Sequence, residues 1–440
     1  MKITALIHLF PPEHCAGSET TLHAALRSLA RRGHEVKVIC ANSKTAPYEI
    51  DGISVVRPPR RGLQSWLEWY VRDSDLLVTH LDLTSQAMTL AMATKIPLIH
   101  FVHNDAQLAC WRVDARVPYK NALTVYNSHW LAAKSSSYGG FTMPSDWVGP
   151  SVVVHPVVEK EHYVCERGTK ITLVNPTPGK GVETFKALAR LLPDRKFLAV
   201  EGGYGEQMIL APDVPPNRGT LPASGNIAWM AHTPDIRKVF RQTKILLMPS
   251  EYESFGRVGI EAACCGIPTI AHPTPGLKEA FGDAGIFIDR NEIAAWFNEV
   301  ERLLTDDIYY HQRSQAVLDL VESIEPEKEF DRLEQAFIET IARYQTGEGK
   351  LMKMWTCDRW IWKLRDGNYK ATDDQRIPVD AVTLFAGKGT SVPEALAREH
   401  GWIDTDAQAK AVAAPAENKA IESPDENKQR KRKKDESVAA

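Results

Sequence analysis

Short apolar runs alternate with amphipathic stretches along the first three quarters of the chain. Ile3–Phe10 and Val36–Cys40 have the pattern of buried strands. Between them, Glu19–Arg32 carries apolar residues at helical spacing and is followed by Gly33, a typical helix stop. A strand, a helix and a second strand in this order predict a parallel sheet. Further buried strands are expected at Leu76–Thr79, Pro97–Val102, Leu123–Tyr126 and Val152–His155.

A second alternating series follows. Its expected strands are Ile171–Val174, Lys196–Val200, Ile245–Met248 and Thr269–Ala271, and its expected helices are Gly181–Leu192, Phe255–Cys265, Glu292–Leu304 and Glu327–Tyr344. The fold class is therefore α/β, with two Rossmann-like, doubly wound domains joined near residues 157–167. We assign residues 1–157 and 158–326 to these domains, and 327–346 to a terminal helix that packs back toward the first. In such sheets ligands bind beyond the carboxyl ends of the strands, here in the cleft between the domains.

The character of the chain changes after residue 346. Residues 347–405 are rich in tryptophan, tyrosine and phenylalanine, which predicts a small appended module. We expect it to be mostly β, with a strand at Trp360–Trp362, a hairpin at Asp366-Gly367 and one helix at Val392–His400. Residues 406–440 lack aromatic residues and are predicted to be a disordered charged tail. Its basic run, Lys428–Lys434, leaves a small chance of nucleic-acid contact.

Composition narrows the class of protein. Of 440 residues, 43% are hydrophobic and 25% are charged, which is typical of a globular protein that is neither disordered nor collagenous. The net charge of −3 provides no global field for nucleic acid or acidic membranes. The seven cysteines include no C-x-x-C pair, and no run of eighteen apolar residues occurs. We therefore expect a protein of a reducing compartment, the cytoplasm.

The stretch from Met248 to Ala271 carries the most chemical information. Glu253 lies in a polar turn after a strand, and Glu261 follows eight residues later in a helix expected to begin near Ser254. Two helical turns would place both carboxylates on one face, toward the same ligand. Backbone amides of Phe255 and Gly256 at the helix start would suit a phosphate. The pattern predicts a pocket for a nucleotide sugar.

This stretch, P-S-x-x-E-S-F-G with a second glutamate eight residues after the first and then G-I-P-T-I-A, resembles the signature of retaining glycosyltransferases of family four, which have the GT-B fold. Other segments are similar to the same family. They are Gly17-Ser-Glu19, Arg32-Gly-His-Glu-Val36, Ile99–Asn104, Val125–Ser128, Gly179-Lys-Gly181, Phe197–Gly203 and Gly276–Glu279. The resemblance covers about residues 1–345.

The resemblance implies roles for individual residues. Lys180 would neutralise the donor diphosphate, and Glu261 would hold the ribose hydroxyls. Glu253, with the amides of Phe255 and Gly256, would bind the transferred sugar. In the first domain Gly17 would let the opening loop approach the diphosphate, because it has no Cβ. His103 would contact the sugar near the reaction centre, so that His103 and Glu253 are the candidate catalytic residues. The family uses no metal or cofactor, so none is expected.

Three positions depart from the family pattern. Asn175 stands where an arginine usually accompanies the lysine, so one cation of the diphosphate clamp is missing. Arg257 or Lys278 could replace that charge. The opening loop reads Ala16-Gly17 instead of two glycines, and Val154–Val158 replaces a segment that usually ends in Asn-Gly.

Three functions remain open on the sequence. The first is a metal-independent, retaining transferase that moves a hexosyl unit from a UDP- or GDP-sugar to a saccharide, lipid or protein acceptor. The second is a nucleotide-sugar epimerase of the same architecture. The third is a non-catalytic carbohydrate-binding or assembly protein. The C-terminal module could recruit a macromolecular target in the first or third case.

Overall fold

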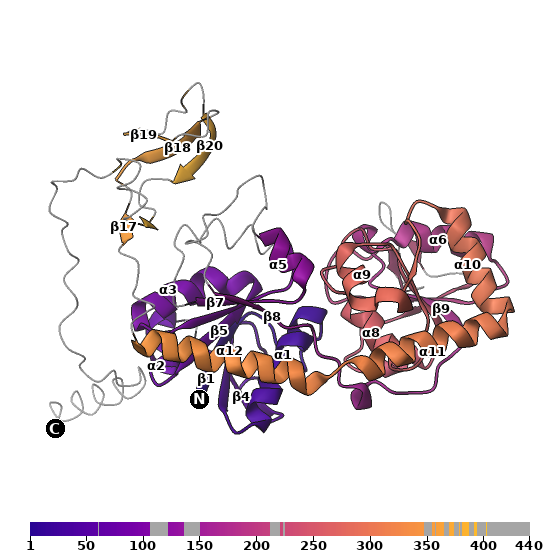
Figure 1. Cartoon of the computed structure of the whole chain (residues 1–440), viewed down its shortest axis with the longest axis horizontal. Coiled ribbons are helices and arrows are strands. Elements are labelled where there is room, and N and C mark those ends of the chain that lie inside the picture. The colour runs from indigo at the N-terminus through magenta and orange to yellow at the C-terminus, as the bar shows by residue number, and fades with distance from the viewer. Residues whose placement is uncertain are drawn as a thin grey trace, which may run out of the picture.

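The structure is a computed structural model that describes residues 1–59, 61–105, 122–135, 150–211, 221–222, 225–346, 354–356, 358–364, 369–373, 378, 381–386, 391–393 and 402. Within these ranges two α/β bodies lie side by side (Figure 1). The predicted hairpin turn at Asp366-Gly367, residues 394–400 of the predicted helix and the predicted charged tail lie outside the described residues. No helix in the described part of the chain is both long and apolar enough to span a bilayer.

The first body is built on an eight-stranded sheet. Its order is β3-β4-β2-β1-β5-β6-β7-β8, and all neighbours are parallel except β3 and β4. The strands are β1 (Lys2–Ile7), β2 (Glu35–Cys40), β3 (Tyr48–Ile50), β4 (Ile53–Val56), β5 (Leu76–His80), β6 (Leu98–Val102), β7 (Ala122–Tyr126) and β8 (Ser151–Val153). The helices are α1 (Gly17–Arg31), α2 (Leu63–Val71), α3 (Thr84–Thr94) and α5 (His129–Ser135). The strands predicted for this half are all present, so the parallel sheet is confirmed.

The second body has a six-stranded parallel sheet of order β13-β10-β9-β14-β15-β16. The strands are β9 (Lys170–Val174), β10 (Phe197–Val200), β13 (Ile227–Met230), β14 (Thr243–Met248), β15 (Thr269–Ala271) and β16 (Ile286–Phe287), with a separate short pair β11 (Ile209–Leu210) and β12 (Leu221–Pro222). The helices are α6 (Val182–Leu191), α7 (Arg237–Phe240), α8 (Arg257–Ala263), α9 (Pro275–Phe281), α10 (Ile293–Thr305) and α11 (Asp307–Ser323). Two doubly wound sheets of this kind confirm the predicted fold class.

The last long helix returns the chain to the first body. Helix α12 (Pro326–Thr346) follows α11 and lies along the first sheet (Figure 1). Its Leu333 and Phe337 are fully buried in the same core as Leu22 and Leu26 of α1. Arg32 at the end of α1 also pairs with Glu327 and Glu334 of α12, with N–O distances of 2.6 and 2.7 Å. The two bodies are therefore joined twice, by the segment after β8 and by α12.

The appended module contains five short strands in its described residues. They are β17 (Met354–Thr356), β18 (Trp360–Leu364), β19 (Tyr369–Thr372), β20 (Ala381–Ala386) and β21 (Ser391–Pro393). Strand β18 pairs antiparallel with both β19 and β20, which confirms the predicted strand at Trp360–Trp362. The helix predicted from Val392 is wrong at its start, because Val392 pairs with Trp355 in an antiparallel ladder.

Candidate functional site

A cavity of about 240 Å³ lies between the two bodies. The opening loop of the first body lines one side through Cys15, Ala16 and Gly17. Thr20 of α1 and Tyr163 of the joining segment also contribute, and the second body provides the rest, from the carboxyl ends of its strands, the turns that follow them and α8. Seven of the predicted site residues meet in this wall: Gly17, Asn175, Lys180, Glu253, Gly256, Arg257 and Glu261. The cavity therefore lies where a ligand was expected, at the carboxyl ends of the strands of the second sheet.

Lys180 is placed by a short turn between β9 and α6. It ends a 3-10 turn, Pro178–Lys180, and Gly181 then adopts a φ of +80° before α6 begins. A Cβ on Gly181 would lie 2.4 Å from the carbonyl oxygen of Pro249, so only glycine fits this close approach to the next strand end. This packing holds Lys180 beside the turn that carries Glu253.

Lys180 and Glu253 form an ion pair in the cavity wall. The Nζ of Lys180 donates to Oε1 of Glu253, which also accepts a 2.9 Å hydrogen bond from Oγ of Ser250. Burial alone would lower the pKa of Lys180, but the carboxylate of Glu253 and the hydroxyl of Tyr204 outweigh it and raise that pKa. Lys180 is therefore a fixed cation at neutral pH in the cavity wall.

Glu261 is placed differently from the sequence expectation. Helix α8 begins at Arg257, not near Ser254, because Gly256 has a φ of +89° and interrupts the helical backbone. Glu253 therefore lies in the preceding turn, and the two carboxylates do not share a helix face. They still line one cavity. That both meet one ligand stays a prediction, while the geometric reason given for it, a shared helix face, was wrong.

The carboxylate of Glu261 is held by Arg257. Nε of Arg257 donates to Oε1 of Glu261 at 2.8 Å, and both side chains are about nine-tenths buried. Burial raises the pKa of Glu261, and the guanidinium of Arg257 opposes that rise. Arg257 also donates to the carbonyl oxygen of Val157 and to the hydroxyl of Tyr163, at 2.7 Å each. Its charge is thus already engaged within the protein.

Asn175 occupies the position of the missing cation. It has a φ of +63°, and its Oδ1 accepts a 2.8 Å hydrogen bond from Nε2 of Gln207. That bond assigns the other amide atom, Nδ2, as a donor; it is buried and has no hydrogen-bond partner among the described residues. A Cβ on Gly202 would approach Oδ1 to 2.2 Å, so a glycine is needed opposite it. Asn175 can offer a neutral donor to a ligand, but no charge.

His103 and Phe255 do not belong to the described cavity wall. His103 follows β6, is 7% exposed, and its Nε2 lies 3.1 Å from Nδ1 of His80. Burial lowers the pKa of His103 to about 4, so it is neutral at physiological pH. Phe255 is buried and its ring stacks on that of His155, with centroids 5.2 Å apart. These two residues line the junction of the bodies beside the cavity.

The turn that carries Glu253 contacts the strand ends of the first body. Nδ2 of Asn127 donates to Oγ of Ser254 at 2.8 Å and to the carbonyl oxygen of His103 at 3.1 Å. The hydroxyl of Tyr252 accepts from the backbone amide of Asp105 at 2.9 Å. Although its side chain lies off the cavity, His103 is therefore tied through one amide to the residue that follows Glu253.

Several wall residues were not singled out from the sequence. They include Tyr163, Glu201, Tyr204, His232 and Ser250. Signals for some were present: Tyr204 lies in the Gly202–Gly205 turn after a strand, and Tyr163 lies in the segment expected to join the domains. Neither motif spacing nor periodicity points to His232, which follows β13, a strand that was not predicted.

Two protein families match separate parts of the chain. Residues 16–157 match the model described as Glycosyltransferase Family 4, and residues 220–318 match the one described as Glycosyl transferases group 1. These matches include Gly17 and His103 in the first body, and Glu253, Phe255, Gly256, Arg257 and Glu261 in the second.

Relatives in sequence match only part of the chain. A D-inositol 3-phosphate glycosyltransferase of Mycobacterium sp. (strain KMS) is 27% identical over 132 residues, which is 29% of this chain and 30% of the relative. One of Arthrobacter sp. (strain FB24) is 36% identical over 77 residues, 17% of this chain and 18% of the relative. The chain thus matches less than a third of the length of these curated relatives.

Solved structures are similar over a much larger share. A sucrose-phosphate synthase from Thermosynechococcus elongatus has a TM-score of 0.63 at 16% identity, covering 78% of this chain and all of the other. The Anabaena protein HepE in complex with UDP-glucose has a TM-score of 0.58 at 16% identity, covering 79% of this chain and all of the other. At these identities the likeness establishes the fold of the two bodies.

Proposed function

We propose that this chain, which belongs to the family 4 glycosyltransferases and has the GT-B fold, transfers a hexosyl unit from a UDP- or GDP-sugar to an acceptor. The observation that supports this most is that Gly17, Lys180, Glu253 and Glu261 line one cavity between the bodies. One lysine and two carboxylates in one cavity suit the three parts of a nucleotide sugar, which are the diphosphate, the ribose and the transferred sugar.

Each group would act on one part of the donor. Lys180 would leave Glu253 and pair with the diphosphate, which gains negative charge as the bond from the anomeric carbon to the phosphate oxygen breaks. Glu261, held by Arg257, would accept hydrogen bonds from the ribose hydroxyls. Glu253 would hold the sugar hydroxyls, and Asn175 would add a neutral hydrogen bond. The acceptor hydroxyl forms the new bond to the anomeric carbon and gives its proton to the phosphate oxygen that breaks away, so that the nucleoside diphosphate leaves with that proton.

Two finer features belong to the same proposal. We infer that the anomeric configuration is retained and that no metal takes part. The support for metal independence is that Lys180 can neutralise the leaving group directly. The support for retention is the resemblance of the Glu253–Glu261 stretch to retaining enzymes. Activity in excess EDTA and the anomeric configuration of the product, determined by NMR, test these two features.

The names of related proteins guide the choice of substrates. HepE was solved with UDP-glucose, so this sugar nucleotide belongs in the donor panel. Several sequence relatives are named D-inositol 3-phosphate glycosyltransferases, so that phosphate belongs in the acceptor panel. The macromolecular target suggested for the C-terminal module remains a prediction.

The proposed donor class is tested by thermal shift with UDP-, GDP-, ADP- and TDP-sugars, with EDTA or Mg²⁺. A donor at 100 times its dissociation constant should stabilise the fold by about 2.7 kcal/mol. One nucleotide sugar should raise the melting temperature with EDTA and with Mg²⁺. Release of its nucleoside diphosphate should then depend on the presence of an acceptor. Absence of a shift with every nucleotide would overturn the proposal.

The Glu261→Ala variant separates the transferase from the alternatives. We expect it to weaken donor binding by about 10- to 100-fold, since it removes a charged hydrogen-bond acceptor, and to abolish measurable turnover. Glu261→Gln is the matched variant, because it keeps an oxygen for Nε of Arg257. An epimerase would convert the nucleotide sugar without acceptor, and a binding protein would keep its partner in both variants. Either result would contradict the transferase assignment.

A further inference from the structure

Arg257 is a buried cation whose hydrogen bonds connect separate parts of the molecule. It is 9% exposed and begins α8. Three of its five N–H groups donate within the protein, one each to Glu261, the carbonyl of Val157 and the hydroxyl of Tyr163. An arginine with so many internal partners is poorly suited to the role of a free diphosphate cation.

Two of these partners lie in the segment that joins the bodies. We define residues 157–163 as the linker. Arg257 bonds near both of its ends, at Val157 and Tyr163, from the side of the second body. The linker also contains a 3-10 turn, Lys160–His162, in which the amides of His162 and Tyr163 are hydrogen-bonded at 3.0 and 2.9 Å.

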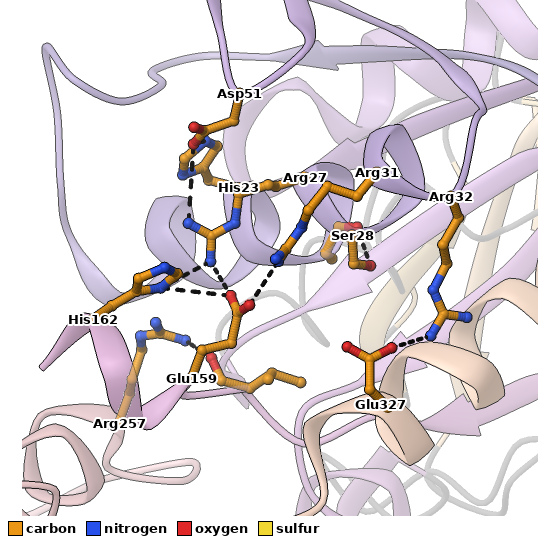
Figure 2. A network of polar contacts seen from close by, with 12 residues as sticks. His23, Arg27, Ser28, Arg31, Arg32, Asp51, Glu159, His162, Arg257 and Glu327 are labelled. Carbon is orange, nitrogen blue, oxygen red and sulfur yellow. Dashed lines mark hydrogen bonds and ion pairs between the residues drawn. The ribbon is translucent and has the colours of Figure 1, made fainter.

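The first body holds the middle of the same linker. Glu159 accepts hydrogen bonds from Arg27 and from Arg31, the latter at 2.6 Å, and both arginines lie on α1. Figure 2 shows Glu159 between these two arginines and His162, with the guanidinium of Arg257 close to the same segment. The Glu159 carboxylate is only 12% exposed, which strengthens its pairing relative to a surface contact.

A continuous set of contacts therefore runs from the cavity to helix α1. Glu261 lines the cavity and is bonded to Arg257; Arg257 is bonded to the linker; and Glu159 in the linker is bonded to α1. We propose that Arg257 is a positioning residue that orients the carboxylate of Glu261 for the donor and couples donor binding to the arrangement of the two bodies through the linker. This inference rests on the proposed function, since it assigns the ligand of Glu261.

Donor binding and the position of the linker are coupled because Arg257 is bonded to Glu261 and to the linker at the same time. A ligand that draws the carboxylate of Glu261 into a new position changes the preferred position of Arg257. A buried guanidinium cannot give up its remaining acceptors without a large desolvation cost, so Val157 and Tyr163 must follow it. The linker then transmits the change to Arg27 and Arg31 through Glu159.

Loss of Arg257 should also change the pH dependence of donor binding. The groups that face Glu261 are Arg257 and Tyr163, and the other charged or titratable groups of the cavity wall are Cys15, Lys180, Glu201, Tyr204, His232 and Glu253. Without the guanidinium, nothing of equal strength opposes the burial that raises the pKa of Glu261. Without Arg257, the carboxylate of Glu261 would become protonated at a higher pH than in the wild type. As the pH falls, donor binding would therefore begin to weaken at a higher pH.

The experiment compares Arg257→Met, Arg257→Lys and Tyr163→Phe with the control Arg195→Met. Arg195 pairs with Glu301 at 3.2 Å and lies outside the cavity wall. Donor affinity is measured across pH with the nucleotide sugar that gives the largest thermal shift. Hydrogen exchange of the His162 and Tyr163 amides is measured with and without that nucleotide sugar.

In the wild type, the donor should slow exchange at these two amides. Arg257→Met should bind the donor about 10-fold or more weakly, with the acid limit of binding moved to higher pH, and lose the slowing. Arg257→Lys should bind the donor more tightly than Arg257→Met, and its acid limit of binding should return toward that of the wild type. Tyr163→Phe should move the pH limit less than Arg257→Met does, because Arg257 and Glu261 remain paired and only the smaller contribution of the Tyr163 hydroxyl is lost, but it should reduce the slowing. Arg195→Met should match the wild type.

Two results would overturn the inference. One is an Arg257→Met protein with wild-type affinity and pH limit. The other is a wild-type linker whose exchange does not respond to bound donor. If the wild type binds no nucleotide sugar, the proposed function fails instead. The ligand-free comparison then still decides the linker contact. Arg257→Met and Tyr163→Phe should both exchange faster at the amides of residues 162 and 163 than Arg195→Met, and equal rates would refute the contact.

Discussion

Replacing Lys180 by methionine should lower kcat/KM for sugar transfer by about 100- to 1,000-fold, the range seen when one group that stabilises a developing anion is removed. In the described cavity wall, Lys180 pairs with Glu253, and we expect the diphosphate to replace that partner. Arg257 is instead held by three internal hydrogen bonds. Asn175 adds no charge. The loss should therefore be larger than in an enzyme that shares the diphosphate between two cations.

Steady-state kinetics with the identified donor measure this effect, and Lys186→Met is the control. Lys186 lies on the next helix, is 7% exposed and pairs with Glu183 at 3.2 Å, but is not part of the cavity wall. It should change the melting temperature without a comparable change in kcat/KM. A Lys180→Met protein within tenfold of the wild type would show that another group neutralises the diphosphate.

The second large effect is expected for Glu253→Gln. The carboxylate accepts hydrogen bonds from Lys180 and Ser250 in the cavity wall, and Glu253 lies one residue before the Ser254–Asn127 contact between the bodies. The sugar gains positive charge at the anomeric carbon during transfer, and a carboxylate stabilises that charge while an amide does not. We expect kcat to fall about 100-fold, with a smaller change in KM.

Glu251→Gln serves as the control for this variant. Glu251 lies two residues earlier in the same turn, its side chain is 77% exposed, and it makes a loose contact with Arg290 at 3.4 Å. Its replacement should leave both constants close to those of the wild type. An increase in KM with unchanged kcat in Glu253→Gln would show that Glu253 binds the donor equally in the ground and transition states.

Much of the fold follows from local patterns in the sequence. The parallel strands are buried on both faces and appear as continuous apolar runs such as Leu76–Thr79. The hairpin of β3 and β4 was missed although Asp51-Gly52, both with positive φ, is a strong turn signal. Its two strands are only three and four residues long, too short for a period of two to be recognised.

The errors at the site have specific physical causes. The start of α8 was placed too early because Gly256 has a positive φ, and a Cβ there would lie 2.3 Å from Cδ2 of Leu277, a neighbour that is close only in the folded chain. The role expected for Arg257 did not account for Val157 and Tyr163, which are close only in the folded chain. Val392 was assigned to a helix, but pairing with Trp355 overrides local helix propensity.

The central claim is that a nucleotide sugar binds in the cavity between the bodies, and hydrogen exchange with and without the best-binding donor tests it most directly. The account predicts slower exchange in the opening loop around Gly17, in the turns carrying Lys180 and Tyr204, and in residues 250–261. It predicts that Lys180→Met abolishes this pattern at the same donor concentration. Protection confined to other surfaces, or a pattern unchanged in Lys180→Met, would contradict the account.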